Sequence, residues 1–118
     1  MKPIDLRALP TRASDLVAAE WKPIRHELGI TAFGAKGYVA SAPGQLMIED
    51  HSEAGTGFEE LYVVVAGEVD FTIEDDDGND QTSHATAGSL VFVPAARGRV
   101  AHSAHSRCGH PRRWRGSR

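Results

Sequence analysis

Many of the side chains that could take part in binding or catalysis lie near the C-terminal end of the chain. Residues 95–118 contain seven arginines together with Trp114, a combination that attracts phosphates and stacks on bases. The same segment contains a set of imidazole and thiol side chains: His102, His105, Cys108 and His110. Their spacing does not match a standard zinc site, and no second pair of ligands stands on a packed element. We therefore favour a basic tail without a zinc site.

The net charge of −3 is the sum of two oppositely charged segments. Residues 1–94 contain all 16 acidic residues and six basic ones, which gives −10. Residues 95–118 contain seven arginines and no acidic residue, which gives +7. An acidic domain repels nucleic-acid phosphates, so nucleic-acid association through the tail is only an alternative, and we favour no nucleic-acid partner.

The composition is that of one folded domain. The chain has 118 residues, of which 41% are hydrophobic, enough for a single core. No apolar run is long enough to span a membrane, so we expect no membrane partner. Cys108 is the single cysteine and cannot form an internal disulfide, which favours a cytoplasmic location.

From residue 36 onward, apolar runs separated by turn residues predict short β-strands. The expected strands cover residues 36–40, 46–51, 60–66, 69–74, 82–86 and 89–93. The 61–65 run is apolar at every position, so we expect both faces of that strand to be covered. Turn signals every 8–12 residues favour an all-β, antiparallel sandwich or barrel.

Two spacings in this region resemble the two halves of the cupin signature. Glu60 is followed by six residues and Gly67, and Gly88 is followed by five residues and Pro94. The glycines permit tight corners, and the proline ends a strand at the rim. The resemblance covers about residues 28–94. It implies an all-β fold, a small cupin-type jelly-roll antiparallel β-barrel.

These features divide the chain into three expected segments. Residues 1–27 form an N-terminal arm, residues 28–94 a cupin-like barrel core, and residues 95–118 a basic, disordered tail. The tail has Val100 and Trp114 as its only large apolar residues, so we expect no further strand there and an incomplete barrel.

The abrupt change in composition after Pro94 suggests a shift of reading frame near residues 94–96, with a natural basic extension as the alternative. A missing strand would leave an apolar face around Val91 and Val93 exposed to solvent. Exposed apolar faces promote association, so we expect a homodimer or another form of self-association.

The resemblance also implies a metal site. Cupins usually hold a divalent metal with two histidines and a glutamate from the first motif and a histidine from the second. Glu60 matches the glutamate, and His51 and Glu53 replace the histidine pair if their loop folds back. Arg99 stands where the second histidine belongs, so that motif supplies no ligand. The implied site is His51, Glu53 and Glu60, binding iron, manganese, zinc or nickel weakly or not at all.

The sequence leaves three functions open, because cupin folds include enzymes, sensors and binders. We favour a module that binds a small molecule in a barrel pocket. The first alternative is a metal-dependent enzyme, similar to the dioxygenases or isomerases, that uses the first-motif ligands. The second is nucleic-acid association through the tail. The expected pocket is lined by Tyr62, Val64, Phe71 and Phe92.

Overall fold

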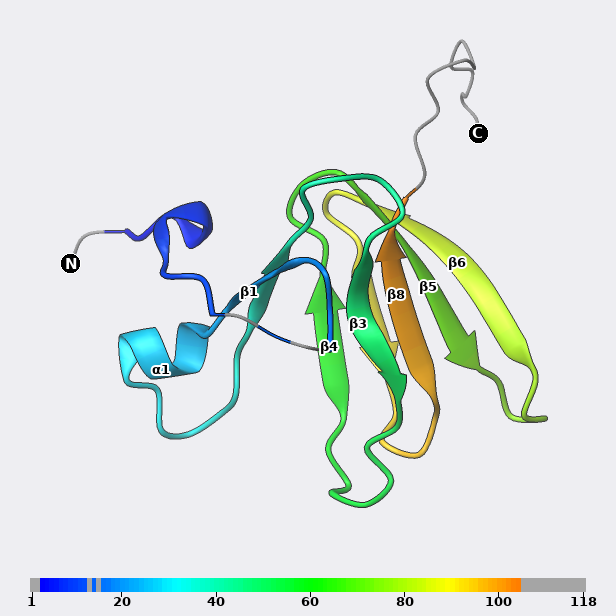
Figure 1. Cartoon of the computed structure of the whole chain (residues 1–118). Helices are drawn as coiled ribbons and strands as arrows, with labels where there is room; N and C mark the ends of the chain where they lie inside the picture. Colours follow the sequence, from blue (N-terminus) through cyan, green and yellow to red (C-terminus); the bar gives the residue numbers. More distant parts are fainter. Residues whose placement is uncertain (1–2, 13, 15, 105–118) are drawn as a thin grey trace, which may run out of the picture.

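A computed structural model describes residues 3–12, 14 and 16–104 of the chain, which fold mainly into short β-strands (Figure 1). One 3-10 turn and one α-helix precede most of the strands. In chain order the elements are η1 (Leu6–Ala8), β1 (Glu20–Lys22), α1 (Ile24–Leu28), β2 (Gly37–Val39), β3 (Leu46–His51), β4 (Glu60–Val63), β5 (Glu68–Glu74), β6 (Asp80–Thr86), β7 (Leu90–Val93) and β8 (Arg99–Ser103).

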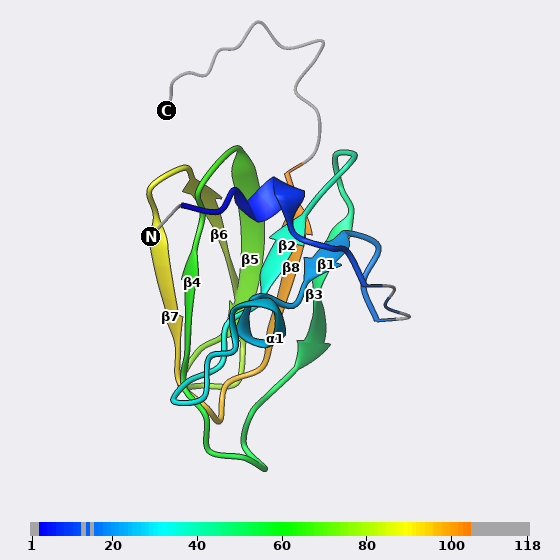
Figure 2. The same cartoon turned by 90° about the vertical axis from the view of Figure 1, so that its left-hand side faces the viewer.

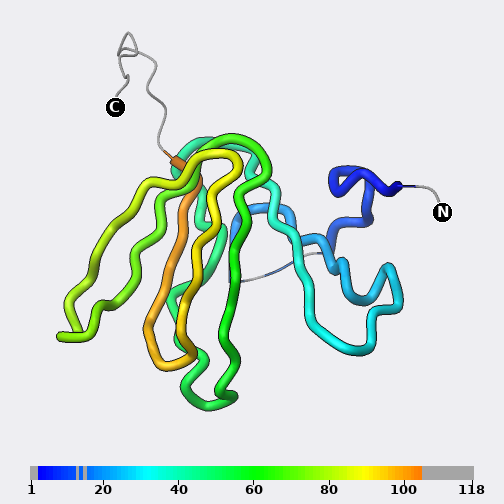
Figure 3. Tube along the Cα trace, turned by 180° about the vertical axis from the view of Figure 1, so that it is seen from behind, coloured from blue at the N-terminus to red at the C-terminus, as the bar shows by residue number. Residues whose placement is uncertain are grey.

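The strands pair in three sheets, and every pair is antiparallel. The largest sheet has the order β3-β8-β5-β6, while β4 pairs with β7 and β1 pairs with β2. Figure 2 shows β4 and β7 side by side, and Figure 3 shows the β5–β6 hairpin on the side away from the N-terminal segment. The expected all-β antiparallel class is confirmed. The sheets of the described residues are not joined into a closed barrel.

The hydrophobic core is built from the inward faces of the large sheet and the segment that follows β4. Phe71 of β5 lies opposite the small side chain of Ala101 on β8, which leaves room for its ring. The Tyr62 ring of β4 packs against Phe71 with a centroid separation of 5.3 Å. Five buried residues form the centre of this core: Ile48, Val64, Phe71, Ala85 and Ala101.

β8 lies in the segment that we expected to form a tail. It pairs with β3 on one side and with β5 on the other, so it is a central strand. Its buried positions alternate, with Arg99, Ala101 and Ser103 facing inward. The expectation of no strand after Pro94 is therefore wrong, while the change of reading frame near residues 94–96 stays a hypothesis. The sequence pattern did not predict this strand because its inward residues are not large apolar ones. Residues 105–118 lie outside the described part of the chain.

The N-terminal segment is also part of the strand structure. β1 pairs with β2, so residues 1–27 include a strand and are not only an extended arm. Helix α1 follows Pro23 and ends at Gly29, whose φ of 67° is the left-handed conformation that glycine adopts easily. The Gly29 amide donates to the carbonyl oxygens of Arg25 and His26, which closes the helix.

β4 is covered on one face only, although coverage of both faces was expected. Its alternation sends Tyr62 and Val64 inward, while the residues between them point outward. No element of the described chain covers these outward side chains. We call the exposed set the outer face of β4–β7: Leu61, Val63, Val65, Leu90 and Phe92, with exposures of 60%, 53%, 72%, 67% and 56%.

The exposed apolar positions on β7 also differ from those that we expected. Val93 is fully buried and Val91 packs against the core, so neither residue belongs to an exposed apolar face. Their neighbours Leu90 and Phe92 are exposed instead, opposite Val63 and Leu61 in the register of the pair. An exposed apolar face is present, but it lies on the other side of the strand.

His84 links two carboxylates across the β5–β6 pair. Its Nδ1 lies 2.6 Å from Asp70 Oδ1, and its Nε2 contacts Glu68. The hydrogen bond to Asp70 is the main reason why the pKa of His84 is raised above its usual value. A raised pKa in the folded state stabilises the fold at pH values below the unfolded pKa, and this contribution is lost as pH rises through the folded pKa.

We expect His84→Gln to lower the melting temperature by a few degrees at about pH 5.5 and by much less at about pH 8.5. The charged bridge contributes on the order of 1 kcal/mol or less, since all three groups are partly exposed. Thermal unfolding of both proteins at the two pH values measures the effect, with His26→Gln, an exposed histidine, as the control. An equal loss at both pH values would contradict the prediction.

Candidate metal site

The folded chain brings His51, Glu53 and Glu60 together. One ligand atom from each residue lies within 4.8 Å of the other two. His51 ends β3, Glu60 begins β4, and the loop between them folds back, as the resemblance required. The backbone amide of Glu53 donates to the Ala95 carbonyl at 2.8 Å, which fixes the loop against the segment after β7.

The ring of His51 is oriented by its own strand. Its Nδ1 lies 2.7 Å from the carbonyl oxygen of Glu49, an acceptor, so Nδ1 carries a proton. Nε2 then faces Glu53 Oε2 at 2.9 Å. A proton shared by these two atoms, or a cation bound to both, would link the imidazole to the carboxylate.

Glu53 is held as a carboxylate by a neighbour on the loop. Thr56 Oγ1 donates to Glu53 Oε1 at 2.9 Å. This hydrogen bond is the largest cause of a lowered pKa for Glu53. Oε1 is therefore occupied, and Oε2 is the oxygen that faces His51. The loop thus presents one ionised oxygen to the imidazole.

The separation of one donor pair fits a divalent cation. Metal bonds of about 2.1 Å at right angles place two donor atoms about 3.0 Å apart. The 2.9 Å between His51 Nε2 and Glu53 Oε2 matches that separation. Glu60 Oε1 lies farther away, 3.9 Å from His51 Nε2. One imidazole and two carboxylates are ligands that first-row divalent metals accept.

Arg99 completes the cluster and was not expected to take part in it. It is 1% exposed, and its Nη1 donates to Glu60 Oε1 at 2.9 Å, while Nη2 donates to the Pro94 carbonyl at 2.8 Å. Its Nε is buried and has no hydrogen-bond partner in the described chain. The sequence signal was its place at the position of the second-motif histidine. Arg99 begins β8, and its side chain reaches Glu60 from there, although arginine is not a metal ligand.

Two tyrosines lie beside the same glutamate. The Tyr62 hydroxyl donates to Glu60 Oε1, the oxygen that Arg99 also contacts. Burial raises the pKa of Tyr62 well above its usual value, and burial together with Glu49 and Glu60 raises the pKa of Tyr38 to about 12. Both phenols stay protonated at neutral pH, so Tyr62 acts as a donor that orients Glu60.

The four expected pocket residues do not line one cavity. Val64 and Phe71 are 5% and 3% exposed and pack with each other in the core, with Tyr62 against them. Phe92 is 56% exposed on the outer face of β4–β7 and does not point toward the other three. The strand period of two explains this correction, since Val91 and Val93 take the inward positions of β7.

The remaining sequence candidates fall at or beyond the end of the described chain. His102 lies on β8 and is partly buried, opposite Asp70 of β5. The others are outside the described residues: His105, Cys108, His110 and Trp114. A zinc site built from the tail therefore lies outside the described residues.

We expect Glu60→Gln to destabilise the fold, because the substitution removes the negative charge that faces the buried Arg99. Breaking a fully buried pair costs 3–5 kcal/mol, and Glu60 is about one-third exposed, so we expect a loss of about 2 kcal/mol. Urea unfolding measures this loss, with Glu59→Gln, an exposed neighbour, as the matched control. Equal stability of the two variants would show that the pair contributes nothing.

Comparisons with known proteins identify no relative of this chain. No family model, no curated protein and no solved structure matches it. Among the described residues, no helix has the length and apolar character needed to cross a membrane.

Proposed function

We propose that this protein is a cupin-type module that binds a small molecule at His51, Glu53 and Glu60 and holds a divalent cation there weakly. The observation that carries the proposal is the convergence of one oriented imidazole and two carboxylates from β3, its loop and β4. Three protein ligands leave coordination positions open, and a small oxygen donor can occupy them.

Arg99 explains why the cation should be held weakly. Its guanidinium is a fixed positive charge 2.9 Å from Glu60 Oε1, the carboxylate oxygen nearest to His51. A bound cation has to share that carboxylate with Arg99 and with the Tyr62 hydroxyl. Two carboxylates and one guanidinium sum to −1, which is less negative charge than two unpaired carboxylates offer a divalent ion.

Each ligand would be positioned by a second group of the chain. The Glu49 carbonyl orients His51, Thr56 orients Glu53, and Arg99 with Tyr62 orients Glu60. A bound divalent ion would supply Lewis acidity toward an oxygen of the small molecule. Iron, manganese, zinc and nickel all accept this donor set.

A metal-dependent enzyme is the second candidate function. The open coordination positions favour it, since a substrate can bind where the chain supplies no ligand. The high pKa values of Tyr38 and Tyr62 remove both phenols as general bases at neutral pH. Nucleic-acid association depends on residues outside the described chain and is not part of the proposal. The cytoplasmic location stays a prediction from the single cysteine.

We also propose a second copy of the chain as a partner at the outer face of β4–β7. The five apolar side chains are each more than half exposed. Together they offer on the order of 400 Å² of apolar surface, so two copies would bury about 800 Å². This area is below the roughly 1,200 Å² of small specific interfaces, so we expect a weak dimer. A face without charges is self-complementary under two-fold symmetry.

We expect His51→Ala to weaken the binding of Co²⁺ to the whole chain by at least about tenfold, because it removes the single nitrogen ligand. Cobalt reports on its coordination through visible absorption, so a titration gives both affinity and ligand type. His26→Ala is the matched control and should bind as the unsubstituted protein does. Equal Co²⁺ binding by His51→Ala and the unsubstituted protein would refute the metal site.

Replacing Arg99 separates the charge effect from the ligand effect. Arg99→His removes the competing charge and adds an imidazole, so its Co²⁺ affinity should exceed that of the unsubstituted protein by about tenfold or more. Arg99→Gln removes only the charge and should give a smaller gain. If neither variant gains affinity while both keep the native far-UV spectrum, Arg99 does not limit metal binding.

We expect Val63→Asp to prevent dimer formation, because it places a charge in the centre of the outer face of β4–β7. Sedimentation equilibrium at about 0.1 mM protein should show a dimer for the unsubstituted chain and a monomer for the variant. Leu28→Asp changes an equally exposed apolar residue on α1 and should leave the dimer intact. A monomeric unsubstituted chain would refute the proposal.

A further inference from the structure

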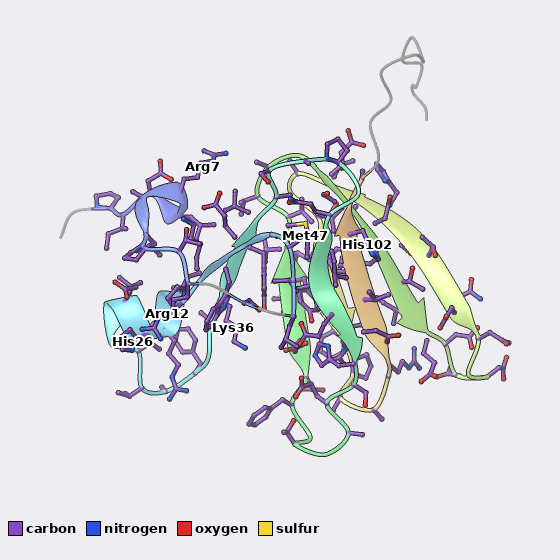
Figure 4. All side chains as sticks on the ribbon, viewed as in Figure 1. Arg7, Arg12, His26, Lys36, Met47 and His102 are labelled. Atoms are coloured by element: carbon purple, nitrogen blue, oxygen red, sulfur yellow. The ribbon has the colours of Figure 1, made fainter. Side chains whose placement is uncertain are left out.

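A pocket lies between β1, helix α1 and the loop that follows the helix, away from the candidate metal site. Its volume is about 500 Å³, which is within the range of small-molecule sites. It shares no residue with the His51 cluster. Figure 4 shows three of its basic residues, Arg12, His26 and Lys36, around α1. The side chains that matter for its chemistry are Arg12, Trp21, Arg25, His26, Ile30 and Lys36.

Every charged residue that lines this pocket is basic. In the described part of the chain, the lysine and arginine side chains that form ion pairs are Lys22, Arg97 and Arg99. Arg12, Arg25 and Lys36 line the pocket and are not among them. Three cations that pair with no carboxylate of the described residues produce a positive potential that favours an anion.

The pocket also has an aromatic wall. Trp21 lines it, and the Lys36 Nζ lies 5.9 Å from the centroid of the Trp21 rings. The indole Nε1 of Trp21 is buried and has no hydrogen-bond partner among the described residues. A buried donor without an acceptor costs about 1–3 kcal/mol. Because Nε1 is not exposed, the part of Trp21 that a ligand can reach is its ring, on which a flat apolar group can stack.

The walls of the pocket are held in place before any ligand binds. The Arg25 backbone amide donates to the Ala35 carbonyl at 3.0 Å, and its side-chain Nε donates to the Ile30 carbonyl at 3.1 Å. The Ile30 amide donates back to the Arg25 carbonyl at 3.0 Å. Arg12 is joined to Trp21 through its amide at 3.0 Å. These bonds hold the backbone at Arg12 and Arg25 and the Arg25 side chain in place, which lowers the ordering cost of binding.

We infer that this pocket binds a small anion that carries a flat apolar ring, such as an aromatic carboxylate or phosphate. The ring would stack on Trp21, and the anionic group would pair with Arg12, Arg25 or Lys36. Arginine and lysine bind carboxylates and phosphates through charge-assisted hydrogen bonds. This inference does not depend on the metal site.

The test compares three probes on the whole chain: 2-naphthoate, the neutral naphthalene-2-methanol of similar shape, and inorganic phosphate. Binding is followed by the NMR signal of the Trp21 indole N–H, assigned with Trp21→Phe. We expect 2-naphthoate to shift this signal and to bind at least about tenfold more tightly than either other probe. The double variant Arg12→Gln and Lys36→Gln should weaken binding by about tenfold or more. Both residues are exposed, and the hydrogen bond of Arg12 to Trp21 is made by its backbone amide, so the fold should persist.

Two variants outside the pocket complete the design. Arg7→Gln removes an exposed basic charge near the pocket but not in its lining, and His51→Ala alters the candidate metal site. Both should bind 2-naphthoate as the unsubstituted chain does. The inference is overturned if the double variant binds equally well, if Arg7→Gln weakens binding as much as the double variant, or if His51→Ala abolishes it. It is also overturned if no probe shifts the indole signal at about 10 mM.

Discussion

The guanidinium of Arg99 is a full positive charge in the interior of the molecule, and the fold has to compensate it. Its charged partner in the described chain is Glu60, at 2.9 Å. Arg99 belongs to β8 of the large sheet and Glu60 to β4 of the small sheet, so the ion pair joins the two. A buried cation without this partner would be costly, and the approach of β4 to β8 therefore depends on it.

The ion pair of Arg99 and Glu60 also affects the candidate metal site. Glu60 is one of the three residues that can hold a metal, yet one of its oxygens already accepts from Arg99 and from Tyr62. The arginine at this position is itself the positive charge that faces Glu60. A histidine here would be a ligand for a bound metal cation instead. The structural role and the proposed weak metal binding thus have one physical cause.

The period of two along each strand explains both what is buried and what is exposed. In β8 it buries Ala101 and Ser103 beside Arg99, so a central strand is formed with little apolar bulk. In β4 and β7 it leaves apolar side chains such as Leu61 and Phe92 on the outside. The number of apolar residues in a strand therefore did not predict whether the strand is central. A strand is central because it pairs on both sides.

The sequence by itself determined the strand positions from β3 to β7 closely, since their alternation and turn residues are local properties. Through a family resemblance it also predicted His51, Glu53 and Glu60 as metal ligands, and the fold brings these three side chains together. The tertiary structure alone decided that β8 is a central strand and that Arg99 meets Glu60. It likewise gathered the basic pocket around Trp21. These features depend on contacts between distant segments, and no local pattern encodes which partner a charged or apolar side chain will meet.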